Sequence, residues 1–239
     1  MKYGLDVSHH NGQLNFKLYD KDFVIIRAGF GSSIKQIDKQ FVNNVTQAIN
    51  NKISFAIYWY SYAKTPTQAI EEANACYTII RQYTTSTTPI FIDIEDESVA
   101  NLTGTELSNI AESFVKTMEN YGYKRLGVYS SDSWYNKLNV SNKYFKWVAR
   151  VGKGGVVGVE PKNAYDIWQY CWVEKSPIGT GNFDISKCND LVYANLFKSD
   201  FNFGVPDVDG DGEITAHDAL VILQNVVGLK GDENNADNK

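Results

Sequence analysis

The stretch Pro89-Ile90-Phe91-Ile92-Asp93-Ile94-Glu95 decides the expected fold, because its apolar residues lead into two carboxylates within a run rich in β-branched and aromatic residues. This pattern predicts a buried strand that ends in a polar site. In a strand, residues i and i+2 point to the same face with Cα atoms about 6.5–7 Å apart, so Asp93 and Glu95 should face outward together. Two carboxylates this close favour one protonated and one ionised group near neutral pH, as glycoside hydrolysis requires. The alternative is a surface strand end that merely carries acids, Asp96 and Glu97 included.

Seven further segments have the composition of short strands: 3–7, 23–29, 54–60, 125–130, 145–150, 166–170 and 183–185. Helical patterns lie between the earlier ones, over 38–51 and after capping sequences at Thr65 and Thr103. Apolar strands that alternate with helices predict a parallel sheet covered on its faces, and eight of them predict a closed barrel of the α/β class. After residue 130 little helix is expected.

Polar side chains follow several of these strands. In parallel barrels the chemistry sits at the C-terminal ends of the strands, so these side chains should share one rim. The rim candidates are Asp6, Tyr60, Tyr62, Asp93, Glu95, Tyr129, Gln169 and Asp184.

The charge of the chain is uneven. Eight acids and two bases fall in residues 205–239, which leaves 20 acids and 21 bases in residues 1–204. The main body is near neutral, and it lacks the basic patch of a nucleic-acid-binding protein. No apolar run is long enough to span a membrane, and residues 1–6 lack the apolar core of a signal peptide.

The three cysteines have no metal-ligand spacing. Cys76 is predicted to be a small core residue. A disulfide between Cys171 and Cys188 is left open, because pairing does not follow from sequence.

Several motifs, taken in order, resemble those of glycoside hydrolase family 25, the lysozymes of bacteria and their phages. The motifs are Asp6-Val7-Ser8-His9-His10-Asn11-Gly12, Ile26-Arg27-Ala28-Gly29, Tyr58-Trp59-Tyr60-Ser61-Tyr62-Ala63, Phe91-Ile92-Asp93-Ile94-Glu95, Trp168-Gln169-Tyr170 and Asp184. The resemblance implies a TIM-like modified β/α barrel whose later strands are irregular. It also implies an N-acetylmuramidase of the endolysin or autolysin type, which cuts the β-1,4 bond between N-acetylmuramic acid and N-acetylglucosamine in peptidoglycan.

By this resemblance Glu95 is the general acid and then the base, and Asp93 stabilises an intermediate formed by the substrate's own acetamido group. Direct attack by Asp93, or its action on water, stays open. Asp6 and Asp184 would orient the pair, and no cofactor is expected in catalysis.

The expected substrate-binding side chains are Tyr62, Tyr60, Tyr129, Trp147, Gln169 and Arg27. Tyr62 is the first choice for a hydrogen bond to the acetamido group, while Tyr129 and Trp147 would offer flat faces to the sugar. For Trp147 a place in the core is an equal alternative. His9 and His10 are interpreted as hydrogen-bonding supports, since adjacent residues on a strand end point in opposite directions.

The C-terminal stretch 207–218 has the pattern of an EF-hand calcium loop, with a glycine at loop position 6 and an apolar residue at position 8. The expected structural Ca²⁺ site comprises Asp207, Asp209, Asp211, Glu213, Thr215 and Asp218. Asp218 at position 12, with a helix after it, resembles a dockerin repeat. A dockerin has two such repeats and this chain shows one, so a cohesin-like partner, a second copy of the chain, or a purely stabilising role all stay open.

The expected organisation is a catalytic barrel over 1–199, a linker over 200–206, a small helical EF-hand module over 207–229 and a disordered acidic tail over 230–239. An enzyme of this kind would act on the cell wall, either outside the cell or after release through a phage holin-type pore. Two other functions stay open: a chitinase-like glycosidase, and a non-catalytic protein that binds the wall or docks to a scaffold through calcium.

Overall fold

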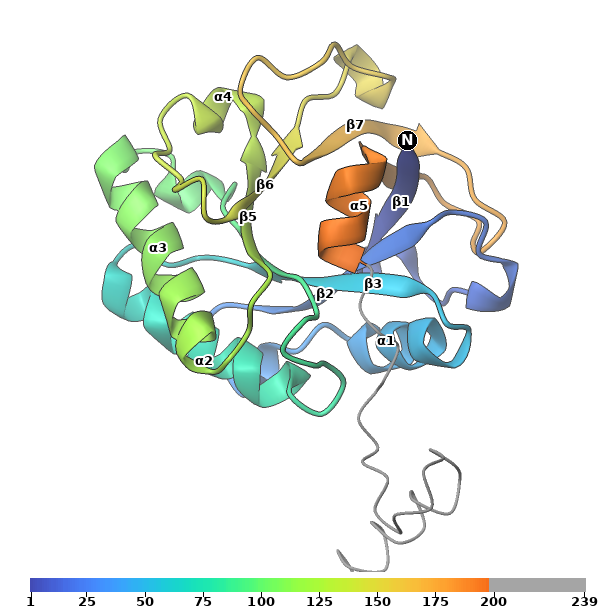
Figure 1. Cartoon of the computed structure of the whole chain (residues 1–239), viewed down its shortest axis with the longest axis horizontal. Helices are drawn as coiled ribbons and strands as arrows, with labels where there is room; N and C mark the ends of the chain where they lie inside the picture. The colour runs from blue at the N-terminus through green and yellow to red at the C-terminus, as the bar shows by residue number, and fades with distance from the viewer. Residues whose placement is uncertain (198–239) are drawn as a thin grey trace, which may run out of the picture. The chain divides into compact units, whose positions relative to one another are not determined.

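Eight strands form a closed barrel within residues 1–197, the part of the chain that the computed structural model describes (Figure 1). Each strand pairs with the next along the chain, and the last pairs with the first. The strands are β1 (Lys2–Val7), β2 (Phe23–Phe30), β3 (Ser54–Tyr60), β4 (Ile90–Asp93), β5 (Leu126–Ser131), β6 (Phe145–Ala149), β7 (Ile167–Glu174) and β8 (Phe183–Cys188). The expected barrel of eight strands is therefore confirmed, although β7 and β8 run further than their sequences predict.

The last strand departs from the expected parallel sheet. Strands β1 to β7 are parallel to their neighbours in that run, whereas β8 is antiparallel to both β7 and β1. The short connection over 175–182 explains this, because a parallel return needs a crossover of a dozen or more residues. The start of β8 therefore lies at the same rim as the carboxyl ends of the other strands. The pairing of β7 with β8 also shifts register twice, which agrees with the expected irregularity.

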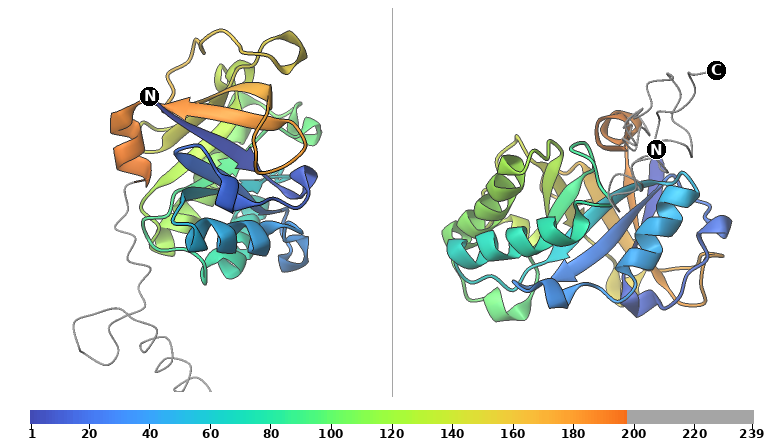
Figure 2. Two further views of the ribbon diagram at one scale, coloured as in Figure 1. Left: turned by 90° about the vertical axis from the view of Figure 1, so that its right-hand side faces the viewer. Right: turned by 90° about the horizontal axis from the view of Figure 1, so that it is seen from below.

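Three long helices cover part of the barrel: α1 (Phe41–Asn50), α2 (Pro66–Ile80) and α3 (Gly104–Asn120). The first contacts β2 and β3, and the third contacts β4 and β5, with α2 beside α3 (Figure 1, Figure 2). Two shorter helices, α4 (Asp132–Tyr135) and α5 (Asp190–Phe197), follow β5 and β8. Helical turns occur at His9–Asn11, Phe16–Leu18, Ile34–Gln36, Glu97–Val99 and Lys153–Gly155.

The helix starts follow the capping signals in the sequence. Thr103 and Glu106 form a complete capping box at α3, which satisfies backbone N–H groups that have no partner inside the helix. At α2 the cap is only half of a capping box. The Thr65 side chain accepts from the Gln68 backbone N–H, but the Gln68 side chain accepts from the Lys64 backbone N–H instead of that of Thr65. The apolar face of α3 is buried and comprises Leu107, Ile110, Ala111, Phe114, Val115 and Met118.

Aromatic rings fill the barrel interior. Trp147 lies edge-on to Tyr58 and Phe91, with ring centroids 5.9 and 5.7 Å apart. A Cβ atom at Gly127 would lie 2.3 Å from the Phe91 ring, so glycine makes the room that Phe91 occupies. At the opposite end from the rim, Phe197 of α5 stacks on Phe23 at the start of β2, at 4.4 Å.

Several predictions concern residues 198–239, which lie outside the described part: the linker, the EF-hand module with its calcium ligands, and the acidic tail. Within residues 1–197 no helix is long and apolar enough to cross a membrane. All three cysteines are buried and free, so Cys171 and Cys188 form no disulfide, and Cys76 lies in the core as expected.

Candidate active site

A cleft of about 380 Å³ opens at the rim where the polar strand ends meet. It contains all four predicted acids, Asp6, Asp93, Glu95 and Asp184. Its lining also includes Ser8, His10, Asn11, Arg27, Tyr58, Tyr60, Tyr129, Trp147, Gln169 and Asn182. All eight strands thus contribute side chains to one site, as expected for the rim of such a barrel.

Gln169 connects the acids of β1 and β8. Its Nε2 donates to Asp6 Oδ2 at 2.9 Å and lies 3.4 Å from Asp184 Oδ2, while its Oε1 accepts from the Tyr129 hydroxyl at 2.8 Å. Asp6 and Asp184 are direct partners in the antiparallel β1–β8 ladder. Gln169, which is predicted to bind substrate, is 2% exposed, and its amide makes these bonds to protein partners on β1, β5 and β8.

All four acids have raised pKa values. Burial is the first cause in each case, because water no longer stabilises the charged carboxylate. The charge of Asp184 adds to the effect at Asp6, and the charge of Glu95 adds to it at Asp184, whose pKa rises to about 7. The four groups therefore titrate as a cluster that holds protons at neutral pH.

Asp93 is the most isolated member of the cluster. It is 3% exposed, and its buried Oδ1 accepts no hydrogen bond from any described residue. Burial, Glu95 and Asp6 raise its pKa well above the usual value, and Arg27 only partly opposes them. An acceptor without a protein partner at the bottom of a cleft is suited to a substrate N–H or O–H group.

Glu95 lies beyond the end of β4, on a more exposed segment. Hydrogen bonds secure that segment on both sides: the Ser130 hydroxyl donates to the Ile94 carbonyl at 2.6 Å, and the Tyr60 hydroxyl donates to Asp96 at 3.1 Å. Burial of its carboxyl within the cleft raises the pKa of Glu95, against a hydrogen bond from Tyr129. Glu95 is more exposed than Asp93, so burial favours the neutral form of Asp93 more strongly than the neutral form of Glu95. This order differs from the one that the family resemblance implies, in which the general acid Glu95 holds the proton.

Arg27 is occupied by protein partners. Its Nε donates to Asp38 Oδ2 at 2.8 Å, and its Nη2 contacts His9 Nδ1. Burial would raise the pKa of Asp38, but hydrogen bonds from His9, Gln40 and Arg27 outweigh it and lower the pKa. Arg27, which is predicted to bind substrate, lines the cleft, but its guanidinium is held in a buried ion pair with Asp38, and its charge lowers the pKa of Asp93. Nothing in the local sequence singles out Asp38.

The two histidines follow the end of β1 in a helical turn, so the expectation of opposite directions is wrong. Their rings lie 4.1 Å apart. His9 Nδ1 lies 2.8 Å from Asp38 Oδ2, and His10 lines the cleft. Within residues 1–197 no group of three or more His, Cys, Asp or Glu side chains has the arrangement of a metal site.

The aromatic candidates separate into three positions. Tyr60 lines the cleft; Tyr62 is 43% exposed and lies against Tyr60, with ring centroids 5.2 Å apart, but is not part of the lining. Tyr129 is buried and belongs to the network of acids. Trp147 is 1% exposed and donates to the Ser186 hydroxyl, so it forms the floor of the cleft and has no free face for a sugar.

Glu72, which no pattern in the sequence singles out, holds the chain after β3. This buried side chain of α2 accepts from the Ser61 hydroxyl at 2.6 Å and from the Tyr62 backbone N–H at 2.8 Å. Burial raises the pKa of Glu72 to about 7, despite those hydrogen bonds. The loop that carries Tyr62 therefore depends on a carboxyl group outside the cleft.

Comparisons with known proteins agree with this geometry. Residues 5–177 match the family model described as glycosyl hydrolases family 25. A search of curated protein sequences found no match to this chain.

Among solved structures, the chain is similar to the catalytic domain of endolysin ply40 from bacteriophage P40 of Listeria monocytogenes, with a TM-score of 0.70 and 23% identity over 82% of this chain and 97% of that one. It is also similar to GHIP, a glycosyl hydrolase 25 of Streptococcus pneumoniae (TM-score 0.71, 22% identity, 82% of this chain and 92% of that one). A third similar structure is the bacterial lysozyme from Streptomyces coelicolor (TM-score 0.68, 22% identity, 82% of this chain and 96% of that one).

The family match covers well over half of the chain, and the matched residues include three of the four acids in the cleft. The fourth, Asp184, is positioned by β8 directly opposite Asp6. The chain therefore belongs to glycosyl hydrolases family 25 and is a glycoside hydrolase.

Proposed function

We propose that this protein hydrolyses peptidoglycan at the β-1,4 bond between N-acetylmuramic acid and N-acetylglucosamine. One observation carries the proposal: four acids with raised pKa values surround a single cleft at the rim of a barrel that belongs to this family. The similarity to an endolysin, a lysozyme and a family 25 hydrolase supports a wall polymer as the substrate.

Glu95 is the proposed general acid. Its raised pKa favours the protonated form that a general acid needs, and its exposed position allows it to reach a glycosidic oxygen. After protonating the leaving oxygen, the resulting carboxylate takes a proton from water in the second half of the reaction. The Tyr129 hydroxyl, which donates to Gln169, also lowers the pKa of Glu95 and would help to stabilise that carboxylate.

Asp93 is proposed to stabilise a substrate-assisted intermediate. The carbonyl oxygen of the 2-acetamido group attacks the anomeric carbon as the glycosidic bond breaks, and positive charge spreads over the acetamido nitrogen. The unpartnered Asp93 Oδ1 would accept from that N–H group. The developing positive charge favours ionised Asp93, so substrate binding would reverse the proton order that burial sets in the free protein.

The test is mass analysis of fragments released from purified peptidoglycan, with the reducing-end sugar identified. We expect new muramic acid reducing ends from the wild-type protein and at least about a 1000-fold slower release from Glu95→Gln, which keeps the shape of the side chain but removes its proton. Glu97→Gln, two residues further on and exposed, should retain wild-type activity. New glucosamine ends would show that the other bond is cut, and an unimpaired Glu95→Gln would refute the acid assignment.

The proposed site of action is the bacterial cell wall, reached either after secretion or after release from a phage-infected cell. The calcium module at 207–229 remains a prediction, as does its partner, whether cohesin-like or a second copy of the chain. No proposed step of the reaction involves Ca²⁺, because all the proposed catalytic groups lie in the barrel.

A further inference from the structure

A second cavity, of about 510 Å³, adjoins the catalytic cleft. The two share Glu95 and Tyr129, so Glu95 stands at the junction between them. The walls of the second cavity come from the end of β5, from α4, from the end of β6, from the loop before β7 and from β7 itself. The side chains on which the inference depends are Asp132, Trp134, Arg150, Lys162 and Trp172.

The second cavity contains two cations, in contrast to the acidic cleft. Arg150 Nη1 lies 3.3 Å from Asp132 Oδ2, and the Lys162 backbone N–H donates to the same oxygen at 3.4 Å, so Asp132 holds the two residues side by side. Asn163 fixes Asp132 further by donating to its Oδ1 at 2.8 Å. Asp132 compensates the charge of Arg150, whereas the exposed Lys162 ammonium forms no ion pair within residues 1–197. Besides Glu95, the wall therefore carries one positive charge, that of Lys162, without an ion-pair partner in the described part of the chain.

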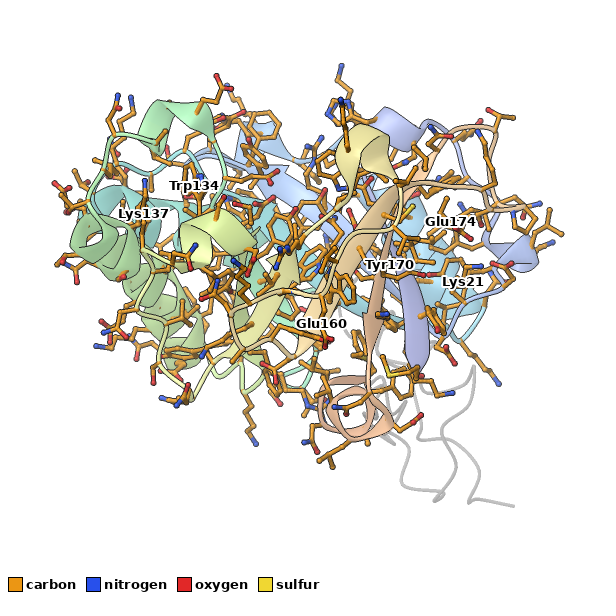
Figure 3. All side chains as sticks on the ribbon, turned by 90° about the horizontal axis from the view of Figure 1, so that it is seen from above. Lys21, Trp134, Lys137, Glu160, Tyr170 and Glu174 are labelled. Atoms are coloured by element: carbon orange, nitrogen blue, oxygen red, sulfur yellow. The ribbon has the colours of Figure 1, made fainter. Side chains whose placement is uncertain are left out.

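Two tryptophans offer apolar surface beside these cations. Trp134 projects from α4, as marked in Figure 3, and is half-buried. Trp172 of β7 is 48% exposed, and its indole N–H lies 3.4 Å from Gln169 Oε1, the amide that also organises the acids. An aromatic face next to a cation suits a sugar ring that bears an anionic substituent.

If the proposed function holds, the position of Glu95 determines which side of the site binds the reacting sugar and which side binds the leaving group. A general acid protonates the oxygen that joins the reacting sugar to the leaving sugar, and it therefore stands between the two. Asp93, Asp6 and Asp184 lie on one side of Glu95, where the reacting sugar develops positive charge. The cavity with Arg150 and Lys162 then lies on the side of the leaving group.

We infer that this second cavity binds the leaving-group end of the glycan chain and recognises a carboxylate on it through Lys162 and Arg150. The inference rests on the proposed function. The first leaving sugar in the proposed cleavage is N-acetylglucosamine, which has no carboxylate, so the carboxylate belongs to the muramic acid that follows it. It has two sources: the lactyl group of a peptide-free muramic acid, or the peptide stem attached to it. Both sources present a carboxylate to Lys162 and Arg150, so only the choice of substrate in the test distinguishes them.

The test measures binding by calorimetry in the Glu95→Gln background, so that the glycan is not consumed. The probes are peptide-free glycan strands with lactyl carboxylates, the same strands with those carboxylates converted to methyl amides, and strands that retain their peptide stems. Lys162→Gln should weaken binding of a carboxylate-bearing strand about three- to tenfold, an effect that added salt diminishes, and should leave the methyl amide unaffected. Lys153→Gln removes an exposed lysine of the same loop that does not line the cavity, and should change none of the three affinities.

Weakening with peptide-free strands identifies the lactyl carboxylate, and weakening only with stem-bearing strands identifies the peptide. Equal weakening with the methyl amide, or no weakening with any strand, overturns the inference. Misfolding is not expected, because the Lys162 side chain makes no hydrogen bond within residues 1–197; equal melting temperatures for the two lysine variants would verify this. If the wild-type protein releases no muramic acid ends yet binding depends on Lys162, the proposed cleavage fails while the carboxylate site stands.

Discussion

Asp93 combines three properties at one residue: near-complete burial, an oxygen without a hydrogen bond from the described residues, and two acidic neighbours, Asp6 and Glu95. Each disfavours the folded protein whenever Asp93 is ionised. Proteins retain such strain at functional sites, where activity requires it. The residue most needed for the proposed reaction is therefore expected to be unfavourable for stability.

Replacing Asp93 with Asn should abolish cleavage and raise the melting temperature at pH 7 by about 2–6 °C, because a buried acid with a raised pKa is replaced by a neutral group of the same shape. The folded-state pKa lies above the unfolded value, so the unfavourable contribution grows as pH rises above the unfolded value. The stability gain of the variant should accordingly shrink toward pH 4. Calorimetric melting curves at several pH values measure this.

Asp96→Asn is the matched control, because hydrogen bonds from Ser98 and Tyr60 outweigh partial burial and lower the pKa of Asp96. That variant should not gain stability at pH 7. A loss of stability in Asp93→Asn at pH 7 would contradict the account of Asp93 as a strained carboxyl.

At the scale of elements, the loop between β3 and α2 shows how a helix outside the site supports it. Glu72 of α2 reaches the backbone after β3 and accepts two hydrogen bonds there. The pKa of Glu72 is about 7 in the folded protein. The folded protein therefore still holds a proton on Glu72 at pH values where the unfolded chain has released it. Glu72 therefore makes stability fall as pH rises from the unfolded value to about 7.

Glu72→Gln should remove this part of the pH dependence. Between pH 4.5 and pH 7 the wild-type free energy of unfolding should decrease, relative to the variant, by up to about 3 kcal/mol. Urea unfolding at pH 4.5, 6 and 7.5 measures the difference, with the exposed neighbour Glu71→Gln as the control. Parallel stability curves for Glu72→Gln and the wild-type protein would show that Glu72 has an ordinary pKa.

At the scale of the whole molecule, the barrel and the C-terminal stretch have separate chemistry. The proposed catalytic side chains all lie within residues 1–197, whereas the predicted calcium ligands lie in 207–218. Catalysis by the barrel should therefore be independent of Ca²⁺.

We expect a chelator to change the stability of the C-terminal module or its partner binding, and to leave cleavage of soluble glycan fragments within about twofold of the untreated rate. Fragment release with EDTA and after addition of excess Ca²⁺ provides the measurement. Complete loss of cleavage in EDTA, while circular dichroism shows the barrel still folded, would mean that the module takes part in catalysis.

Much of this protein follows from local sequence. Alternating and continuous apolar runs predict eight strands near their observed bounds, and capping residues such as Thr103 locate helix starts, because both signals depend on neighbours within a few residues. The placement of acids after strands, together with the family motifs, also predicts that Asp6, Asp93, Glu95 and Asp184 share one site.

Only the tertiary structure decides what depends on residues far apart in the chain. The antiparallel direction of β8 brings Asp184 opposite Asp6. The amide of Gln169, predicted to bind substrate, instead makes hydrogen bonds to partners on three other strands. Trp147 belongs to the core and offers no free ring face to a sugar, because Tyr58, Phe91 and Ser186 surround it. The physical reason is common to all of these: burial, pKa and hydrogen-bond occupancy are properties of the packed environment, and sequence spacing does not contain them.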